Sequence, residues 1–343
     1  MNDTIVIGAG VSGLLAAHRL QAAGLNVTVL EARDRTGGRT HSVPVPGGQV
    51  DLGASWVWDT EAHVHRLLAE LGIQTFPHHR DGTDIFEQPG RTQRGRLPRS
   101  AVPEQRVRGG TQAITDALAA KVSGIHLRTP VRAIEEIDGG LRVRTDTGAL
   151  TTRHVVAALP PAVLASRVSL PNTLDARQRQ AMHLAAVWMA DVAKVVAVYP
   201  ERFWREEGLS GRAASLIGPM SEVHDLSGPG GSPAALFGFV HRAQTSDDWR
   251  ERVVAQLGRL FGPRALEPTV LHIAAWWEDE ETAPAPGAGQ AQQLLGHPLL
   301  RQPALGGRLH LCSTETSATS PGHIDGAVER AEAVARHILE GDR

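Results

Sequence analysis

A glycine-rich turn near the start of the chain has the composition of a phosphate-binding site. Gly8, Gly10 and Gly13 follow the β-branched run Thr4–Ile7 and open an apolar helical pattern. In such a turn the first glycine permits the tight bend, the second lets the backbone approach a pyrophosphate, and the third allows close packing of helix on strand. Free N–H groups at the helix N-terminus then favour an anion. The turn therefore predicts a pyrophosphate site.

An acidic residue completes this pattern. Val27–Leu30 is predicted to be a second strand, and Glu31 stands at its end, at the distance from Gly13 that is typical of a dinucleotide-binding fingerprint. A carboxylate in that place accepts hydrogen bonds from both ribose hydroxyls and repels a 2′-phosphate. The unit therefore predicts a bound adenine dinucleotide other than NADP.

A single lysine interrupts an apolar strand. Lys194 lies in the alternating segment Asp191–Tyr199, where Val192, Val196 and Val198 share its face. Burying an ammonium group is costly, so a lysine in this setting tends to mark a functional site. The alternative is a lysine at a sheet edge that reaches solvent. Lys194 is the first candidate catalytic residue.

The composition of the 343 residues excludes several functions. With 41% hydrophobic residues and a net charge of −2, the chain is long enough for two domains and has no basic run that would bind nucleic acid. No stretch approaches the roughly 18 apolar residues of a membrane span. Cys312 is the only cysteine, so we expect no intrachain disulfide and no thiolate metal cluster, and no metal is among the expected cofactors. No charged segment precedes Thr4, and we expect no signal peptide and a cytoplasmic location.

Alternating strand and helix patterns must position these residues, which predicts the α/β class. A helix is predicted from Leu14 to Leu20 with a stop at Gly24, and others over residues 61–71, 112–122, 249–261 and 324–338. Further strands are predicted at residues 126–127, 130–134, 142–145, 154–158, 191–199, 236–240, 270–276 and 309–312. Residues 77–106 are rich in turn formers and predict loops with a short hairpin.

Three more segments extend the glycine turn into a longer pattern. Arg33 and Arg35–Thr40 follow the second strand, Asp51–Trp56 comes next, and the pair Thr314–Glu315 precedes an apolar-faced helix. Together they resemble the flavoprotein superfamily of the flavin-containing amine oxidases, which also includes protoporphyrinogen oxidase, carotenoid desaturases and renalase. The resemblance implies a Rossmann-type FAD-binding domain with a parallel sheet, interleaved with a smaller substrate domain on a mixed or antiparallel sheet with helices.

The same resemblance implies discontinuous domains. The FAD-binding domain is expected to comprise residues 1–75, 107–182 and 288–343, and the substrate domain residues 76–106 and 183–287. Many family members place a long helical insertion between the segments that match Trp56 and Gly109–Gly110. Here only residues 57–108 separate them. A reduced helical cap and a more open cavity are therefore expected.

By resemblance, the cofactor is FAD. Gly37, Gly38 and Arg39 are expected against its pyrophosphate and ribityl chain, and the terminal helix is expected to face the pyrimidine end of the flavin. The other expected contacts come from Gly8, Gly10, Gly13, Glu31, Arg33, Gly53, Ala54, Ser55, Trp56, Val131, Trp276, Thr314, Glu315, His323 and Ile324. Relatives that attach FAD through cysteine use a position matching residues 284–288. Since Cys312 lies elsewhere, non-covalent binding is expected.

The implied chemistry is oxidation of an amine. In the family, a lysine on the strand that matches Asp191–Tyr199 holds a water near flavin N5, and a Phe-Trp pair follows, here Phe203-Trp204. Hydride from the α C–H bond of a neutral amine passes to N5, the resulting imine is hydrolysed, and O₂ reoxidises the flavin to give H₂O₂. The implied partners are a small amine substrate and O₂, for a monomer or a homodimer.

Two positions depart from the family pattern. His323 stands where tyrosine or phenylalanine is usual, so it is a second candidate catalytic residue, as a substrate contact or a proton carrier. The segment 284–288, which supplies the other aromatic wall of the flavin site in many relatives, holds no aromatic residue. The candidates that could rebuild this cage are Trp56, Trp58, Trp188, Trp276 and Trp277.

Other functions remain open from the sequence alone. The short chain and simplified cap also fit a renalase-like oxidase of reduced nicotinamide isomers, which would not need Lys194. Two alternatives remain. One is a dehydrogenase or desaturase that uses another electron acceptor, and the other is a non-enzymatic FAD-binding regulator. Measuring turnover of amines and of reduced nicotinamides would distinguish the amine oxidase from the renalase-like oxidase.

Overall fold

The strand that precedes the glycine turn lies in the middle of a sheet. The computed structural model describes residues 2–341. In it, β1 (Asn2–Ile7) pairs in parallel with β2 (Val27–Leu30) and β13 (Gly148–Ala157). The other strands of this sheet are β10 (Ile125–His126), β11 (Val131–Ile137), β12 (Gly140–Thr145) and β19 (Leu309–Leu311). Their order is β10-β2-β1-β13-β12-β11, with β19 also on β13. Since parallel strands end at one edge, the turns after β1 and β2 lie close together.

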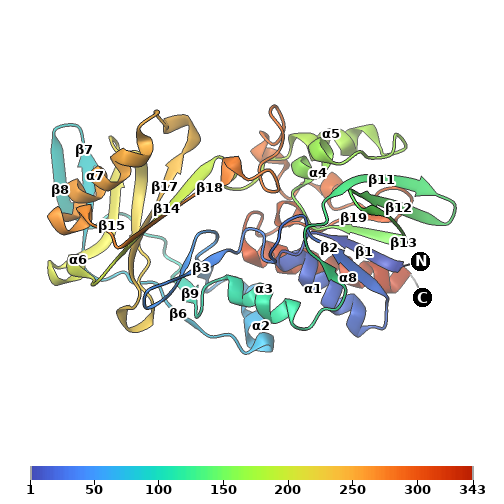
Figure 1. The fold of residues 1–343 in the computed structure, drawn as a ribbon, viewed down its shortest axis with the longest axis horizontal. Coiled ribbons are helices and arrows are strands. Elements are labelled where there is room, and N and C mark those ends of the chain that lie inside the picture. The colour runs from blue at the N-terminus through green and yellow to red at the C-terminus, as the bar shows by residue number, and fades with distance from the viewer. Residues whose placement is uncertain (1, 342–343) are drawn as a thin grey trace.

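Helices cover both faces of this sheet, which explains why the last residues of its central strands, Ile5–Ile7 and Val155–Ala157, are continuously apolar. One face packs on α1 (Val11–Ala22) and α8 (Ile324–Gly341), with α2 (Ala62–Leu71) and α3 (Gln112–Ala119) beside them. The other face packs on α4 (Pro161–Arg167) and α5 (Ala176–Leu184). The helices α1 and α8 therefore share one hydrophobic core, and Figure 1 shows them side by side on the same face of the sheet.

A second seven-stranded sheet stands at the opposite end of the molecule (Figure 1). Its strands are β7 (Thr83–Gln88), β8 (Arg91–Gly95), β14 (Val192–Tyr199), β15 (Leu209–Ser215), β16 (Met220–Asp225), β17 (Ala234–His241) and β18 (Val270–Ala275). They run in the order β18-β14-β17-β16-β15-β7-β8, antiparallel except for the parallel pair β15–β7. This arrangement places β14 between two neighbours, away from the edges.

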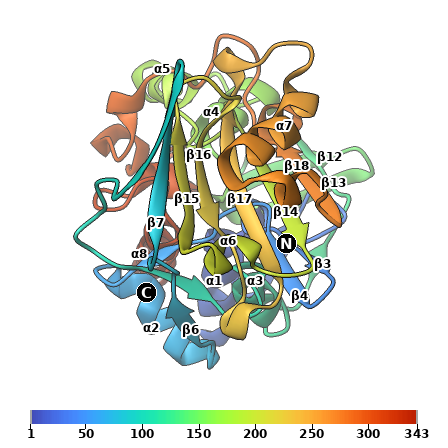
Figure 2. The ribbon, with the colours of Figure 1, turned by 90° about the vertical axis from the view of Figure 1, so that its left-hand side faces the viewer.

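The second sheet is also covered on both faces. The helix α7 (Trp249–Phe261) and the short α6 (Phe203–Glu206) pack on one face, and Figure 2 shows α7 lying across the strands. The other face meets Val50 and Leu52, in and just after the hairpin of β3 (Ser42–Val45) and β4 (Gly48–Asp51). A small sheet of β5 (Val57–Trp58), β9 (Glu104–Val107) and β6 (Thr75–Pro77) completes the fold. Short 3₁₀ turns lie at Pro229–Gly231, Arg242–Gln244, Pro263–Leu266, Trp276–Glu278, Gln292–Leu294, Pro298–Leu300 and Thr314–Thr316.

The predicted α/β class, with one parallel-rich sheet and one separate mixed sheet, is confirmed. Several elements differ from the sequence-based expectation. The hairpin expected within residues 77–106 is regular and joins the second sheet as β7 and β8. The helix predicted over residues 112–122 ends at Ala119, and the strand predicted to reach Trp276 ends at Ala275. The helix α4 was missed because Pro160-Pro161 resembles a stop, although proline is favourable in the first turn of a helix.

The domain boundaries stay a prediction, although the segments of each sheet can be stated. The first sheet uses residues from 2–30, 125–157 and 309–311, and the second uses residues from 83–95 and 192–275. Among the described residues, no helix is both long and apolar enough to cross a membrane.

Candidate active site

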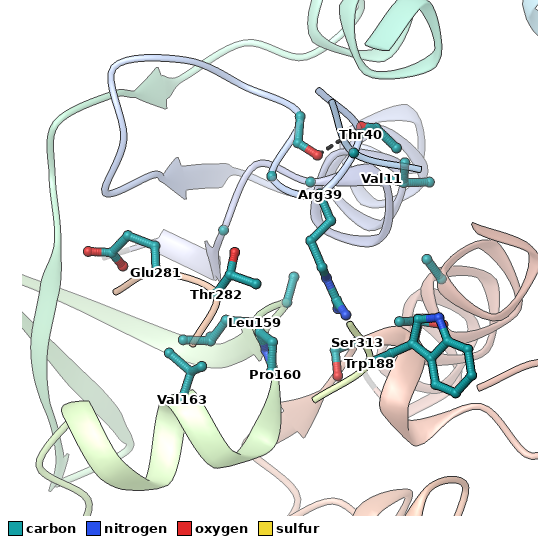
Figure 3. A pocket seen from close by; sticks show the side chains of 18 of the residues that line it. Val11, Arg39, Thr40, Leu159, Pro160, Val163, Trp188, Glu281, Thr282 and Ser313 are labelled. Carbon is teal, nitrogen blue, oxygen red and sulfur yellow. Dashed lines mark hydrogen bonds between the residues drawn. The ribbon is translucent and has the colours of Figure 1, made fainter. Parts of the chain in front are cut away.

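A cavity of about 650 Å³ lies between the two sheets. Its wall includes the ends of β1 and β2, side chains of β14, β16 and β17, and the start of α8. In the close view of Figure 3, Leu159, Pro160 and Val163 at the start of α4 form part of the wall, and Arg39 extends toward the segment of Ser313. Ligand sites typically span about 300–1,000 Å³, so the cavity has room for a large organic ligand.

The glycine turn has the geometry that phosphate binding requires. Gly8 has a φ of +101°, a conformation that strains other residues. A Cβ atom on Gly13 would lie 1.9 Å from the Gly8 carbonyl oxygen, so only glycine allows α1 to pack this closely. Gly10 faces the cavity, and no side chain caps the N-terminus of α1. The N–H groups of this helix end are therefore directed to a ligand, as a pyrophosphate site needs.

Glu31 both stiffens this turn and lines the cavity. One of its carboxylate oxygens accepts the N–H of Ala9 at 2.7 Å, and the other accepts the N–H of Arg33 at 2.9 Å. Each carboxylate oxygen has a second lone pair, so Glu31 can still accept a hydroxyl from a bound ribose. Arg33 is in turn held by Asp279 at 2.7 Å and by the Thr282 hydroxyl at 2.9 Å.

A buried ion pair holds Arg39 at the cavity. The guanidinium of Arg39 donates to both carboxylate oxygens of Glu315, at 2.6 and 3.0 Å. Glu315 has no exposed surface and does not line the cavity, whereas Arg39 does. Burial by itself would raise the pKa of Glu315, but the charge and hydrogen bonds of Arg39 outweigh it and the pKa is lowered. Glu315 is therefore an ionised anchor behind Arg39, which keeps one face toward a ligand.

The structure brings most of the predicted cofactor residues to one cavity. Those that line the cavity are Gly8, Gly10, Glu31, Arg33, Gly37, Gly38, Arg39, Gly53, Ala54, Ser55, Trp56, Val131, Trp276, Thr314, His323 and Ile324. Gly13 and Glu315 lie behind the wall and support it. Of the two adjacent tryptophans, Trp276 faces the cavity and donates to the Leu52 carbonyl at 3.1 Å, while Trp277 packs against Trp249 in the core. Contact of these residues with FAD stays a prediction.

Lys194 is buried, with 2% of its surface exposed, and its strand β14 lies between β17 and β18. The reading of an edge-strand lysine that reaches solvent is therefore wrong. Its ammonium group donates to the Gly53 carbonyl at 2.8 Å and to the Ser55 hydroxyl, and it lies 4.5 Å from the centre of the Phe237 ring. Burial lowers the pKa of Lys194 to about 7, with Asp51 opposing this shift and Arg106 adding to it. The group can therefore gain or lose a proton near neutral pH.

A row of side chains crosses the second sheet at Lys194. Phe239 on β17 is paired with both Lys194 and Glu222, so the three side chains share the face that lines the cavity. Two strand spacings, about 10 Å, separate the backbones of Lys194 and Glu222. A hydrogen bond from His224 at 3.0 Å is the largest cause of the lowered pKa of Glu222, so this carboxylate is charged. The row therefore carries a titratable cation at one end and an anion at the other.

Tryptophans form much of the remaining wall on this side. Trp56, Trp58, Trp188 and Trp276 line the cavity, whereas residues 284–288 do not. Trp56 packs on Phe237 with the ring centres 5.2 Å apart, and its indole N–H donates to His78 at 3.3 Å. Burial lowers the pKa of His78 well below its usual value, which keeps the ring neutral and able to accept this bond.

His323 is held on two sides. Its ring lies over Trp58, with centres 4.6 Å apart and planes at 31°, and its Nδ1 is 2.6 Å from a carboxylate oxygen of Glu61.

The pair Phe203-Trp204 is on the other face of the sheet from Lys194, where it packs with Tyr199. That pair is part of the core, and it does not contact the lysine that it accompanies in sequence.

Several charged residues at this site were not predicted from the sequence, among them Glu61 and Glu222; Arg132, Arg167, Glu280 and Glu281 also line the cavity. Glu61 was assigned only to the start of a helix, because an acidic residue there also stabilises the helix end. Glu222 lies in the polar alternation Ser221-Glu222-Val223-His224, which indicates a strand with one wet face. That pattern could have located the strand, although its closeness to Lys194 depends on pairing with β17. Within residues 2–341, no group of three or more His, Cys, Asp or Glu side chains is arranged to hold a metal ion.

The sequence model of one family covers nearly the whole chain. The family is described as flavin containing amine oxidoreductase, and it matches residues 11–104 and 101–339. The chain therefore belongs to the flavin-containing amine oxidoreductase family, whose name implies a flavin cofactor.

Individual relatives agree with this assignment. The chain is 26% identical to "Probable flavin-containing monoamine oxidase A" of Dictyostelium discoideum, over 98% of this chain and 97% of the relative. It is 25% identical to the putrescine oxidase of Kocuria rosea, over 98% and 95% of the two chains. Its structure matches that of a wild-type putrescine oxidase bound to putrescine with a TM-score of 0.84, at 25% identity and 99% coverage of both chains. The alignment with the Dictyostelium relative extends over 452 residues, so that relative has segments which this chain lacks.

Proposed function

We propose that the chain is an FAD-dependent oxidase of a small amine, with O₂ as the electron acceptor. The observation that carries the proposal is the position of Lys194. A buried lysine on a strand of the second sheet opens into the same cavity as the glycine turn of the first sheet. This joins the expected dinucleotide site to a titratable group in one cavity, where a bound cofactor and a substrate could meet.

The residues around the cavity fit FAD. The uncapped N-terminus of α1 suits the pyrophosphate, Glu31 suits a ribose, and Arg39 adds a fixed positive charge. Cys312 is fully buried beneath the helices and absent from the cavity wall, and burial raises the pKa of its thiol to about 12. Non-covalent binding is therefore proposed. When bound, FAD supplies the hydride acceptor for the amine and, once reduced, the reductant for O₂.

The side chains of the second sheet prepare the substrate end. Lys194 in its protonated form places a positive charge beside the cavity, where negative charge develops as oxygen is reduced. Ser55 and Gly53 fix the position of its ammonium group. Trp56 and Phe239 exclude water, and their ring faces attract an organic cation. Glu222 adds an anion at the far end of the same row. The aromatic faces and Glu222 together favour a ligand that is both apolar and positively charged, as an alkylammonium is, whereas the charge of Lys194 acts on the reduction of oxygen.

The first test is anaerobic reduction of the purified yellow protein. Primary, secondary and polyamines should bleach the flavin absorbance, and air should restore it with release of H₂O₂. Reduced nicotinamide isomers serve as the competing substrates. Bleaching by these isomers and by no amine would replace the proposal with the renalase-like alternative, and recovery only with a quinone would replace the oxidase by a dehydrogenase.

The second test addresses Lys194 through reoxidation. Lys194→Met should slow the reaction of the reduced protein with O₂ by at least about 10-fold, because a fixed charge at the reacting centre typically contributes that much or more. The chain contains one other lysine, Lys121, which is exposed after α3 and offers a matched control. Lys121→Met should leave the rate unchanged. Equal rates for both variants would remove the assigned role of Lys194.

A further inference from the structure

The pair formed by Glu61 and His323 has the chemistry of a proton acceptor. The Nδ1 atom of His323 lies 2.6 Å from Oε1 of Glu61. A carboxylate accepts hydrogen bonds and does not donate them, so Nδ1 carries the hydrogen. In a neutral ring the lone pair is then on Nε2. Within residues 2–341, Nε2 of His323 has no hydrogen-bond partner, and the residue lines the cavity.

Both members of the pair are fixed by other parts of the fold. Glu61 is only 5% exposed, and its second carboxylate oxygen accepts the N–H of Trp58 at 2.9 Å. The His323 ring lies over Trp58, and its backbone carbonyl accepts the Thr314 hydroxyl at 2.7 Å. The side chain of His323 nevertheless keeps 33% of its surface exposed. The ring is therefore held in orientation and still has access to water.

We propose that His323, positioned by Glu61, accepts the proton that an alkylammonium substrate must lose before oxidation. This inference rests on the proposed amine oxidation. Alkylammonium groups lose their proton only near pH 10, so at neutral pH about one molecule in a thousand is already neutral. Transfer of H⁺ from R–CH₂–NH₃⁺ to Nε2 leaves R–CH₂–NH₂ and an imidazolium, whose Nδ1–H remains on the Glu61 carboxylate. The free lone pair on nitrogen then allows hydride to leave the α carbon, and the exposed edge of the ring returns the proton to water.

The neighbouring titratable groups are less suited to accept the substrate proton, because they already take part in hydrogen bonds. Both carboxylate oxygens of Asp325 are in use, one by the N–H groups of His63 and Val64 and the other by the Ser320 hydroxyl. His65 is engaged through Nε2 with the Trp58 carbonyl at 3.0 Å.

Glu222 and Lys194 also line the cavity. Glu222 accepts a hydrogen bond from His224, and Lys194, which can titrate near neutral pH, donates to Gly53 and Ser55. Among residues 2–341, Nε2 of His323 has no hydrogen-bond partner, so its lone pair is open to a ligand at the Glu61 side of the cavity.

The test compares the holoenzyme with His323→Phe, which keeps an aromatic ring on Trp58 and removes the proton acceptor. The rate of anaerobic flavin reduction by a simple alkylamine is measured from pH 6 to 10. At pH 7 the variant should be slower by about 100-fold, within the range of general base catalysis. Its rate should rise with pH and approach that of the parent near pH 10, where the substrate is neutral in solution. A ratio of the two rates that does not change with pH overturns the inference.

A second variant keeps the inference testable if the first fails to fold. Glu61→Gln preserves the volume and an acceptor for Nδ1–H, but it removes the charge that stabilises the imidazolium. A smaller loss of about 10-fold at pH 7 is expected, again shrinking toward pH 10. A pH-independent loss, or none, contradicts the role of Glu61. Failure of every amine to reduce the parent overturns the proposed function itself, whereas reduction of the parent with a pH-independent ratio overturns only the role of the pair.

Discussion

The two walls of the cavity are built by different means. The wall at the first sheet relies on the backbone: glycines at Gly8 and Gly13, the uncapped end of α1, and one ion pair behind Arg39. The wall at the second sheet relies on side chains that stand in a row across the strands, with Lys194 and Glu222 at its ends. A backbone site binds one shape of ligand and tolerates almost no change, whereas a side-chain site can be retuned one residue at a time.

The largest effect is expected from a single methyl group on the backbone wall. In Gly13→Ala the new Cβ would meet the Gly8 carbonyl oxygen at 1.9 Å, so α1 must move away from the phosphate turn. Overpacking of this kind costs about 1–3 kcal/mol or more, and the same loss at the cofactor site weakens FAD binding by roughly 5-fold to 150-fold or more. The flavin-to-protein absorbance ratio of the purified protein should fall clearly below that of the parent. Gly95→Ala, where nothing lies within 4 Å of the added atom, is the control and should retain FAD. A yellow Gly13→Ala protein would show that the backbone wall is not rigid.

The second prediction concerns the free energy of unfolding, which the burial of Lys194 in the second sheet lowers. The pKa of Lys194 falls from an ordinary 10.5 to about 7 on folding, so between these values the unfolded chain binds more protons than the folded one. Its burial therefore destabilises the fold most at and below pH 7, and the cost fades as the pH rises to 10.5. The advantage of Lys194→Met in free energy of unfolding should shrink by about 1.4 kcal/mol per pH unit across this window. Denaturant melts of parent and variant from pH 7 to 10 measure the slope, and a constant difference would mean that Lys194 does not titrate there.

A smaller effect, on substrate selectivity, is expected from Glu222, which stands at the opposite end from Lys194 in the row of side chains across the second sheet. Glu222→Gln removes a negative charge about two strand spacings from Lys194. A substrate with a second ammonium group should lose about 10-fold in kcat/KM, the usual scale for one charged contact, and a monoamine of similar length should change little. Glu280→Gln supplies the control, since Glu280 lines the cavity near Arg167 and away from this row. Equal losses for both substrates would show that Glu222 recognises no distal charge.

The contrast between the walls also explains what the sequence could predict. Gly8, Gly10, Gly13 and Glu31 lie within one strand–helix–strand unit, so spacing along the chain is nearly equivalent to position in space. The turn, both strands and the helix between them could therefore be predicted before the structure was known. The apolar face around Lys194 likewise predicted burial, because alternation along a strand is a local property.

Contacts between distant segments could not be predicted in this way. Glu61 and His323 are 262 residues apart, and their meeting depends on how α2 packs on α8. Phe203-Trp204 follows Lys194 closely in sequence but faces the opposite side of the sheet. The choice between Trp276 and Trp277 depended on where β18 ends, and boundaries of this kind are decided by tertiary packing rather than by local propensity.

The bond between Arg39 and Glu315 also bears on how the protein is made. The two residues are 276 positions apart, and β19 and α8, which flank Glu315, add the last strand beside β13 and the last helix against α1. A nascent chain emerges from the ribosome N-terminus first, with the glycine turn complete long before its buried carboxylate anchor exists. We therefore expect the cofactor to be loaded late, only after the segment with Glu315 and α8 has been made.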